Sequence, residues 1–188
     1  MALGSMMAGG NPSNGRQEND HYPTPPDVTR ALLKLNPFPA VEHVWEPCAG
    51  DGAMARVLKT RYPHVLMSDI APKPCEDVIQ EADFFDVKFG FYDTIITNPP
   101  FNLAEKFILH AFDNLNIKRL ALVLKSTYWH AASRQALFQK HPPQMVCPLT
   151  WRPDFLGLGR PTMEAQWCVW NKTLPIAPTL YVPLRKPD

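Results

Sequence analysis

Hydrophobic residues recur along the chain in two alternating patterns, short apolar runs and longer segments with helical spacing. The clearest helical segment is predicted to begin at Asn102 as its N-cap, with Lys106, His110 and Asp113 pointing away from the core. The opposite face of this predicted helix is apolar and comprises Leu103, Phe107, Ile108, Ala111, Phe112 and Leu115.

Three further helices are predicted between the apolar runs. The first spans residues 24–35, with Thr24 as N-cap and Pro25 at the first helical position, and it ends before Pro37. The second spans 51–60, where the buried face is formed by Met54, Val57 and Leu58. The third spans residues 133–140.

The apolar runs themselves predict seven strands. Residues 120–124 are continuously apolar, which is typical of a strand that is buried on both faces of a sheet. The other strands are expected at 43–46, 64–69, 77–81, 92–97, 144–150 and 165–170.

Alternation of strands with helices indicates an α/β fold, in which helices flank a parallel sheet and form the crossovers between its strands. The last two strands lack an intervening helix, so we expect them to form an antiparallel hairpin. One domain over residues 21–175 is predicted, preceded by a disordered segment over 1–20 and followed by a proline-rich tail over 176–188.

Charge and cysteine content limit the functional classes. A net charge of +1 gives no overall attraction for nucleic acid, so any basic residues that bind it must gather on one face. The four cysteines are far apart and the six histidines are scattered, which predicts reduced thiols in a cytoplasmic protein and no metal site. No apolar run approaches the ~18 residues of a membrane span, so we expect no membrane association.

The loop after the first strand, residues 46–52, has the composition of a ligand site. Gly50 and Gly52 permit a tight turn close to a ligand, at the edge of the sheet where ligands bind in open α/β folds. The dinucleotide fingerprint GxGxxG is absent, while Glu46 and Asp51 favour a ligand that carries a sulfonium and an ammonium. An ordinary glycine-containing turn remains the alternative.

Acidic residues also follow the next two predicted strands. Asp69 ends the second strand, where an acid can bind both ribose hydroxyls of a nucleoside. Asp83 and Phe84 follow the third strand, and they are suited to bind the amino group of adenine and to stack on its ring. Three acids at successive strand ends favour a nucleoside cofactor over three unrelated loop residues.

The segment Asn98-Pro99-Pro100-Phe101 directly follows the fourth strand. An exocyclic amine of adenine is a poor nucleophile, because its lone pair is delocalised into the ring. The Asn98 side-chain oxygen and the Pro99 carbonyl are two acceptors that can hold both amine hydrogens, and the prolines fix them in place. Phe101 can stack on an extruded base. The alternative is a plain loop before a helix.

These motifs resemble those of N6-adenine DNA methyltransferases, and the small chain resembles the stand-alone enzymes of phages and prophages. The resemblance rests on residues 22–26, 46–52 and 97–101 and covers about 22–170. It implies a Rossmann-like, seven-stranded class I methyltransferase fold, S-adenosylmethionine as cofactor, and DNA with a flipped adenine as partner. Catalysis is then assigned to Asn98, Pro99, Pro100 and Phe101.

The resemblance also assigns the cofactor-binding residues. Tyr22, Pro23 and Thr24 are expected to contact the methionine moiety, and Asp69 the ribose, with Ile70 beside it. Asp83 and Phe84 are expected to bind the adenine. The loop that lines the methionine moiety contributes Glu46, Pro47, Cys48, Gly50 and Gly52.

The chain departs from the family in its C-terminal part, because only 18 residues follow Trp170 where a large target-recognition domain is normal. We therefore expect low sequence specificity. The candidate DNA reader is the loop 151–164 with Arg152 and Arg160, and a flexible hairpin turn is the alternative. Residues 125–130 follow the fifth predicted strand and lie at the same edge of the sheet. Their aromatic side chains either contact the target base or pack in the core. Within this segment the candidates are Lys125, Tyr128, Trp129 and His130.

Other functions remain open at the level of sequence. The same tetrapeptide serves methylation of adenine in RNA, and a related loop serves methylation of a glutamine amide in proteins. A non-catalytic module that binds the cofactor or a partner is a further alternative, although such a module has no need of Asn98 and Phe101.

Overall fold

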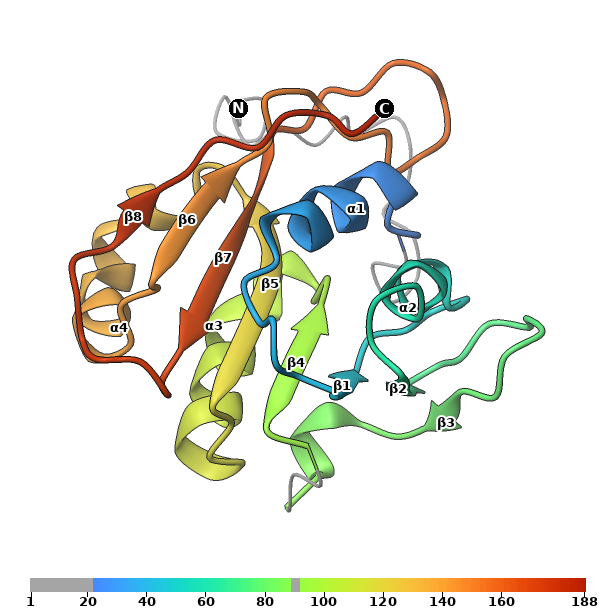
Figure 1. Cartoon of the computed structure of the whole chain (residues 1–188), viewed down its shortest axis with the longest axis horizontal. Coiled ribbons are helices and arrows are strands. Elements are labelled where there is room, and N and C mark those ends of the chain that lie inside the picture. Colours follow the sequence, from blue (N-terminus) through green and yellow to red (C-terminus); the bar gives the residue numbers. More distant parts are fainter. Residues whose placement is uncertain (1–21, 89–91) are drawn as a thin grey trace, which may run out of the picture.

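The computed structural model describes residues 22–88 and 92–188, so the segment 1–20, expected to be disordered, lies outside the described residues. One mixed sheet forms the middle of the molecule and helices cover both of its faces (Figure 1). The helices are α1 (Pro26–Leu35), α2 (Ala53–Leu58), α3 (Ala104–Leu109) and α4 (Gln135–Lys140). The strands are β1 (His43–Glu46), β2 (His64–Asp69), β3 (Gln80–Glu81), β4 (Thr94–Thr97), β5 (Arg119–Lys125), β6 (Met145–Pro148), β7 (Ala165–Asn171) and β8 (Leu180–Tyr181).

The strand order β3-β2-β1-β4-β5-β7-β6-β8 places β1 and β4 next to each other. From β3 to β5 all pairs are parallel, whereas β7 runs antiparallel to both β5 and β6. The chain winds outward from β1 in one direction and from β4 in the other. The loops after β1 and β4 therefore lie side by side at a topological switch point, where ligands bind in open α/β sheets.

Two apolar clusters, one on each face of the sheet, form most of the core. Along β5, Ala121 and Val123 point into the cluster that contains α1 and α2, while Leu120, Leu122 and Leu124 point into the cluster that contains α3. This alternation explains the uninterrupted apolar run, because both faces of β5 are buried. Tryptophans of β7 are divided in the same way between the two clusters.

The C-terminal hairpin of β6 and β7 is antiparallel, as predicted. The sheet has one strand more than expected, because β8 in the proline-rich tail pairs parallel with β6. At the other edge, β3 is only two residues long, so the predicted strand over 77–81 is largely loop. No helix within the described ranges is long and apolar enough to cross a membrane.

Both predicted helix caps are wrong. The helix α1 begins at Pro26 with Pro25 as its N-cap, and Thr24 makes no cap bond. Two prolines without an N–H group leave fewer donors to cap at this end. Asn102 lies inside a 3₁₀ turn, Phe101–Leu103, which ends where α3 begins. His110, expected to face solvent, is half-buried against Phe84 at 4.9 Å between ring centroids.

Candidate active site

The loop between β1 and α2 is built around two glycines in the left-handed region. Gly50 has φ of 57° and Gly52 has φ of 78°, conformations that other residues rarely adopt. A side chain at Gly52 would also meet Arg56 and Asp77 at 3.3 Å. The resulting turn is closed by a 2.7 Å hydrogen bond from the Gly52 N–H to the Ala49 carbonyl. Both glycines are therefore required by the backbone.

Asp69 at the end of β2 is tied directly to this loop. Its Oδ2 accepts a hydrogen bond from the Gly50 N–H at 2.8 Å, and its Oδ1 accepts one from the Ala71 N–H at 2.9 Å. Each oxygen keeps a lone pair for a further donor. The next residue, Ile70, is 58% exposed beside this carboxylate. The structure thus brings together an acid, an apolar side chain and the glycine loop.

Glu46, the last residue of β1, is 2% exposed, and its Oε2 has no hydrogen-bond partner among the residues that the structure describes. Burial raises the pKa of this carboxyl well above its usual value, and the negative charges of Asp69 and Asp51 raise it further. Burial likewise raises the pKa of the neighbouring Cys48 thiol. A cationic ligand group next to Glu46 would offset this cost of ionisation.

Asp83 and Phe84 follow β3, as expected, but they have local roles. Asp83 accepts a hydrogen bond from the Phe85 N–H at 2.9 Å and so caps a 3₁₀ turn. The Phe84 ring is 4% exposed and stacks on Phe107, with centroids 4.4 Å apart and an interplanar angle of 7°. Adenine stacking by the Phe84 ring is therefore not supported, because this ring packs inside the core.

The segment Asn98–Phe101 leaves the end of β4 beside the glycine loop. The Asn98 Nδ2 donates a hydrogen bond to Thr24 Oγ1 at 3.1 Å, across 74 residues of sequence. This bond turns the Asn98 Oδ1 away from Thr24, and Oδ1 is buried without a partner in the described structure. A buried, unpartnered acceptor is unfavourable until a donor enters. The loop Asn98–Phe101 thus has an anchored amide whose side-chain oxygen lacks a partner among the described residues.

The N-terminal motif adjoins the same site through Thr24, which is buried. Tyr22 is half-buried against the cluster that contains α1, whereas Pro23 is exposed. The Thr24 contact with Asn98 is the part of this site that sequence reasoning missed. No local pattern signals it, because its two partners are 74 residues apart in sequence.

Residues 125–130 divide between rim and core. Lys125 lies over the Phe101 ring, with its Nζ 5.6 Å from the ring centroid. Tyr128 is buried, which raises the pKa of its hydroxyl to about 12, so it belongs to the core and is not a base contact. Trp129 is half-buried and donates from Nε1 to Cys168 Sγ at 3.3 Å, while His130 is exposed.

The loop 151–164 has an ordered turn at its tip. The Asp154 carboxylate accepts hydrogen bonds from the Gly159 N–H at 2.6 Å and the Leu158 N–H at 3.2 Å. These backbone donors lower the pKa of Asp154. At the base of the loop, Arg152 pairs with Glu164 at 2.8 Å, whereas Arg160 is exposed near the tip. The two arginines therefore lie in different surroundings.

No three acidic, histidine or cysteine side chains of the described ranges are grouped to hold a metal ion. Pro47, Pro99 and Pro100 complete the two loops, and Pro100 accepts a hydrogen bond from the Leu103 N–H at 2.9 Å. The site as a whole lies where the loops after β1 and β4 meet. Glu46 and Asp69 lie on one side of it and the unpartnered side-chain oxygen of Asn98 lies on the other.

The chain matches no known family profile and no curated protein. Solved structures of similar fold include a type I restriction-modification methyltransferase subunit from Streptococcus thermophilus. It shares 13% identity with this chain at a TM-score of 0.62, over 85% of this chain and 46% of that one. This chain spans about half the length of the type I subunits that it matches.

Two further structures are similar over most of the chain. The 23S rRNA methyltransferase ErmE has 12% identity and a TM-score of 0.60, over 84% of this chain and 72% of that one. A protein from Listeria monocytogenes, described as a putative class I S-adenosylmethionine-dependent methyltransferase, has 14% identity and a TM-score of 0.55, over 92% of this chain and 68% of that one. The predicted Rossmann-like class I methyltransferase fold is thereby confirmed.

Proposed function

We propose that this protein transfers a methyl group from S-adenosylmethionine to the N6 amine of adenine in DNA. The observation that carries the proposal is the Asn98 amide, whose Nδ2 is held by Thr24 while its Oδ1 is buried and vacant. An amine hydrogen of the target base would satisfy this acceptor. The exposed ring of an extruded adenine would lie against Phe101, which is half-buried at the start of the 3₁₀ turn.

The cofactor site is proposed to lie between the glycine loop and the end of β2. The cofactor supplies an electrophilic methyl group on a sulfonium. Glu46 faces its positive charges, and Asp69 receives the ribose hydroxyls on oxygens that already hold the loop backbone. Ile70 covers the apolar face of the adenine, and the polar atoms of Asp83 bind its edge.

The protein's part in the chemistry is to position and polarise the amine. Asn98 Oδ1 and the Pro99 carbonyl accept its two hydrogens and draw the lone pair out of conjugation with the ring. S-adenosylmethionine, held by Glu46 and Asp69, would supply the methyl group to this nitrogen and would keep the electron pair of the carbon–sulfur bond on its sulfur. One proton leaves the nitrogen to solvent, which balances the charge.

DNA binding is proposed to follow the rim next to this loop. Lys125 and Arg160 supply positive charge for phosphates, and Arg152 joins them where its exposed pair with Glu164 opens, because such exposed pairs are weak. His130 and Trp129 lie on the same rim. The small loop 151–164 offers little surface for base readout, which favours short or relaxed target sequences.

A methyl-transfer assay against three substrate classes tests the proposal. The protein is incubated with labelled S-adenosylmethionine and, separately, DNA, RNA and a protein extract, and the products are identified by mass spectrometry. We expect 6-methyladenine in DNA and little label elsewhere. Label in adenine of RNA or in glutamine of protein would show that DNA is not the substrate. No label in any of the three reactions would refute methyl transfer.

Relaxed specificity predicts a second result. Sequencing of methylated plasmid DNA should find modified adenines in many sequence contexts, because the rim offers few side chains for major-groove readout. Modification confined to one motif of several base pairs would contradict this expectation and would point to a reader outside the residues named above.

The substitution Asp69→Asn should weaken cofactor binding while the loop stays folded. Asparagine keeps one acceptor for a backbone N–H but loses the charge and one acceptor for a ribose hydroxyl. Charge-assisted hydrogen bonds are worth about 1.5–3 kcal/mol, so we expect the Kd for S-adenosylmethionine to rise roughly tenfold or more.

Calorimetric titration measures this change, and Asp93→Asn is the matched control. Asp93 pairs with Arg119 at 3.1 Å. It precedes the first residue of β4, so it lies at the end of the strands opposite to the proposed cofactor loop. An unchanged Kd in Asp69→Asn would remove the ribose role of this residue.

A further inference from the structure

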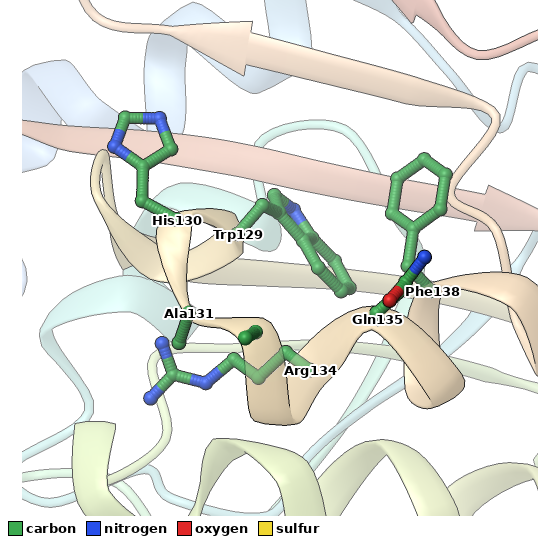
Figure 2. A pocket seen from close by; sticks show the side chains of 7 residues that line it. Trp129, His130, Ala131, Arg134, Gln135 and Phe138 are labelled. Carbon is green, nitrogen blue, oxygen red and sulfur yellow. The ribbon is translucent and has the colours of Figure 1, made fainter.

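A pocket of about 360 Å³ is formed by the segment that follows β5 and by the first turn of α4 (Figure 2). Its volume is within the range of roughly 300–1,000 Å³ that is typical of ligand sites. The lining residues are Trp129, His130, Ala131, Ala132, Arg134, Gln135 and Phe138. Only Trp129 and His130 among them have a role in the function proposed above, so Arg134, Gln135 and Phe138 are side chains without an assigned role.

Two aromatic rings form a right-angled corner in this pocket. The rings of Trp129 and Phe138 are 5.1 Å apart at an interplanar angle of 82°. Trp129 is fixed by its hydrogen bond to the buried Cys168. Both rings remain partly exposed, so the core does not occupy them fully. A corner of this kind accepts one planar ring that stacks on one wall and presents its edge to the other.

The other end of the pocket is polar and positively charged. Arg134 donates to the Tyr128 carbonyl, and its guanidinium carbon lies 4.1 Å from the centroid of the Tyr128 ring. These are its partners within the described ranges, and neither is a carboxylate. Figure 2 shows the guanidinium near Ala131 and away from Phe138, whereas the exposed His130 ring points away from it across the turn. A phosphate is the ligand group that suits this end.

The pocket is connected to the proposed catalytic loop through a short segment. Lys125, four residues before Trp129, lies over the Phe101 ring. The Ser126 N–H donates to the Glu164 carbonyl at 3.0 Å, which joins this segment to the loop 151–164. Residues 125–129, which begin at the last residue of β5, therefore join the proposed catalytic loop to the first residue that lines the pocket.

We propose that this pocket binds the base of a nucleotide that neighbours the methylated adenine. The base stacks in the corner of Trp129 and Phe138, Gln135 contacts its edge, and the phosphate lies near Arg134. This inference rests on the proposed function, since it assigns a second nucleotide to the same substrate. It makes an unpaired stretch of at least two bases the preferred form of that substrate.

The proposal is tested with the full chain and a series of DNA probes, each of which carries one abasic site at a different position. The probe is a fluorescein-labelled single-stranded DNA 12-mer with one central adenine and thymines elsewhere, bound in the presence of S-adenosylhomocysteine and followed by fluorescence anisotropy. We expect an abasic site at one position next to the adenine to weaken binding roughly tenfold, the scale of one lost stacked base. Abasic sites further away should have little effect.

The variant Phe138→Leu keeps an apolar side chain but removes the aromatic wall. It should bind the intact probe more weakly and should lose most of its sensitivity to the neighbouring abasic site. The control Tyr181→Leu changes a 71% exposed aromatic on β8, the last strand of the sheet, and should behave as wild type. An unchanged affinity for S-adenosylhomocysteine verifies that Phe138→Leu is folded.

The outcomes separate this inference from the proposed function. The pocket assignment is overturned if the abasic site weakens probe binding equally in Phe138→Leu and in the wild-type protein. It is also overturned if no abasic position next to the adenine weakens binding, or if the probe does not bind at all. Methyl transfer to adenine measured alongside any of these results leaves the proposed function standing. Abasic sensitivity that depends on Phe138, without any methyl transfer, supports the pocket and refutes the enzyme.

Discussion

Asn98→Ala is expected to lower the rate of methyl transfer by roughly a hundredfold to a thousandfold, the scale measured when one preorganised polar group is removed from an active site. The vacant Oδ1 is the atom whose loss matters, because it is the buried acceptor available to the amine. The Kd for S-adenosylmethionine should change little. The measurement is single-turnover transfer of labelled methyl to DNA, with calorimetry for the cofactor.

The variant Thr24→Val separates the acceptor from its support. It keeps Asn98 but removes the oxygen that holds the amide in its orientation at 3.1 Å. Loss of one neutral hydrogen bond costs about 1 kcal/mol, so we expect a rate roughly fivefold lower. If Asn98→Ala and Thr24→Val both abolish cofactor binding, the contact is structural and the catalytic role of Asn98 is wrong.

Glu46→Gln is expected to make the unliganded protein more stable and to weaken cofactor binding. Burial holds the pKa of the Glu46 carboxyl above its value in the unfolded chain. At a pH between these two pKa values, Glu46 is protonated in the folded chain and ionised in the unfolded chain. Stability is therefore lost as pH rises through this window, and glutamine removes that loss. At pH 7 we expect a gain of about 1–3 kcal/mol in the free energy of unfolding.

The same carboxyl predicts a proton linked to cofactor binding. A cationic ligand favours the ionised form, so the raised pKa of Glu46 should fall when S-adenosylmethionine binds, and a proton should be released to the buffer. Calorimetry in buffers of different ionisation enthalpy measures this release. Glu46→Gln is its control. Identical binding enthalpies across buffers for the wild-type chain would show that Glu46 does not ionise on binding.

Much of the sheet was predictable because its strands are buried on both faces. The continuous apolar run in β5 is buried on both faces, and three of the four residues of β1 are buried, as such short apolar runs predict. The loop residues Gly50 and Asn98 were predictable for a related reason, since each lies in the loop that follows a strand. Strand ends bring such residues to one edge of the sheet without further information.

Contacts between distant segments were not predictable in this way. Phe84 has the sequence position of a ligand contact, yet three aromatic neighbours from other elements enclose it in the core. The strand β8 follows several prolines, and its pairing depends on the exposed edge that β6 happens to offer. Local propensity carries no information about either partner, so only the packed structure decides them.

The position of β7 has a consequence for synthesis of the protein. This strand lies between β5 and β6, and its Trp167 donates to the Val28 carbonyl in α1, 139 residues earlier. On the ribosome, α1 and β5 emerge long before the strand that covers them. The nascent chain must therefore keep an apolar sheet edge exposed until about residue 171 is available, which makes slow, late folding and a need for chaperones the expected behaviour during translation.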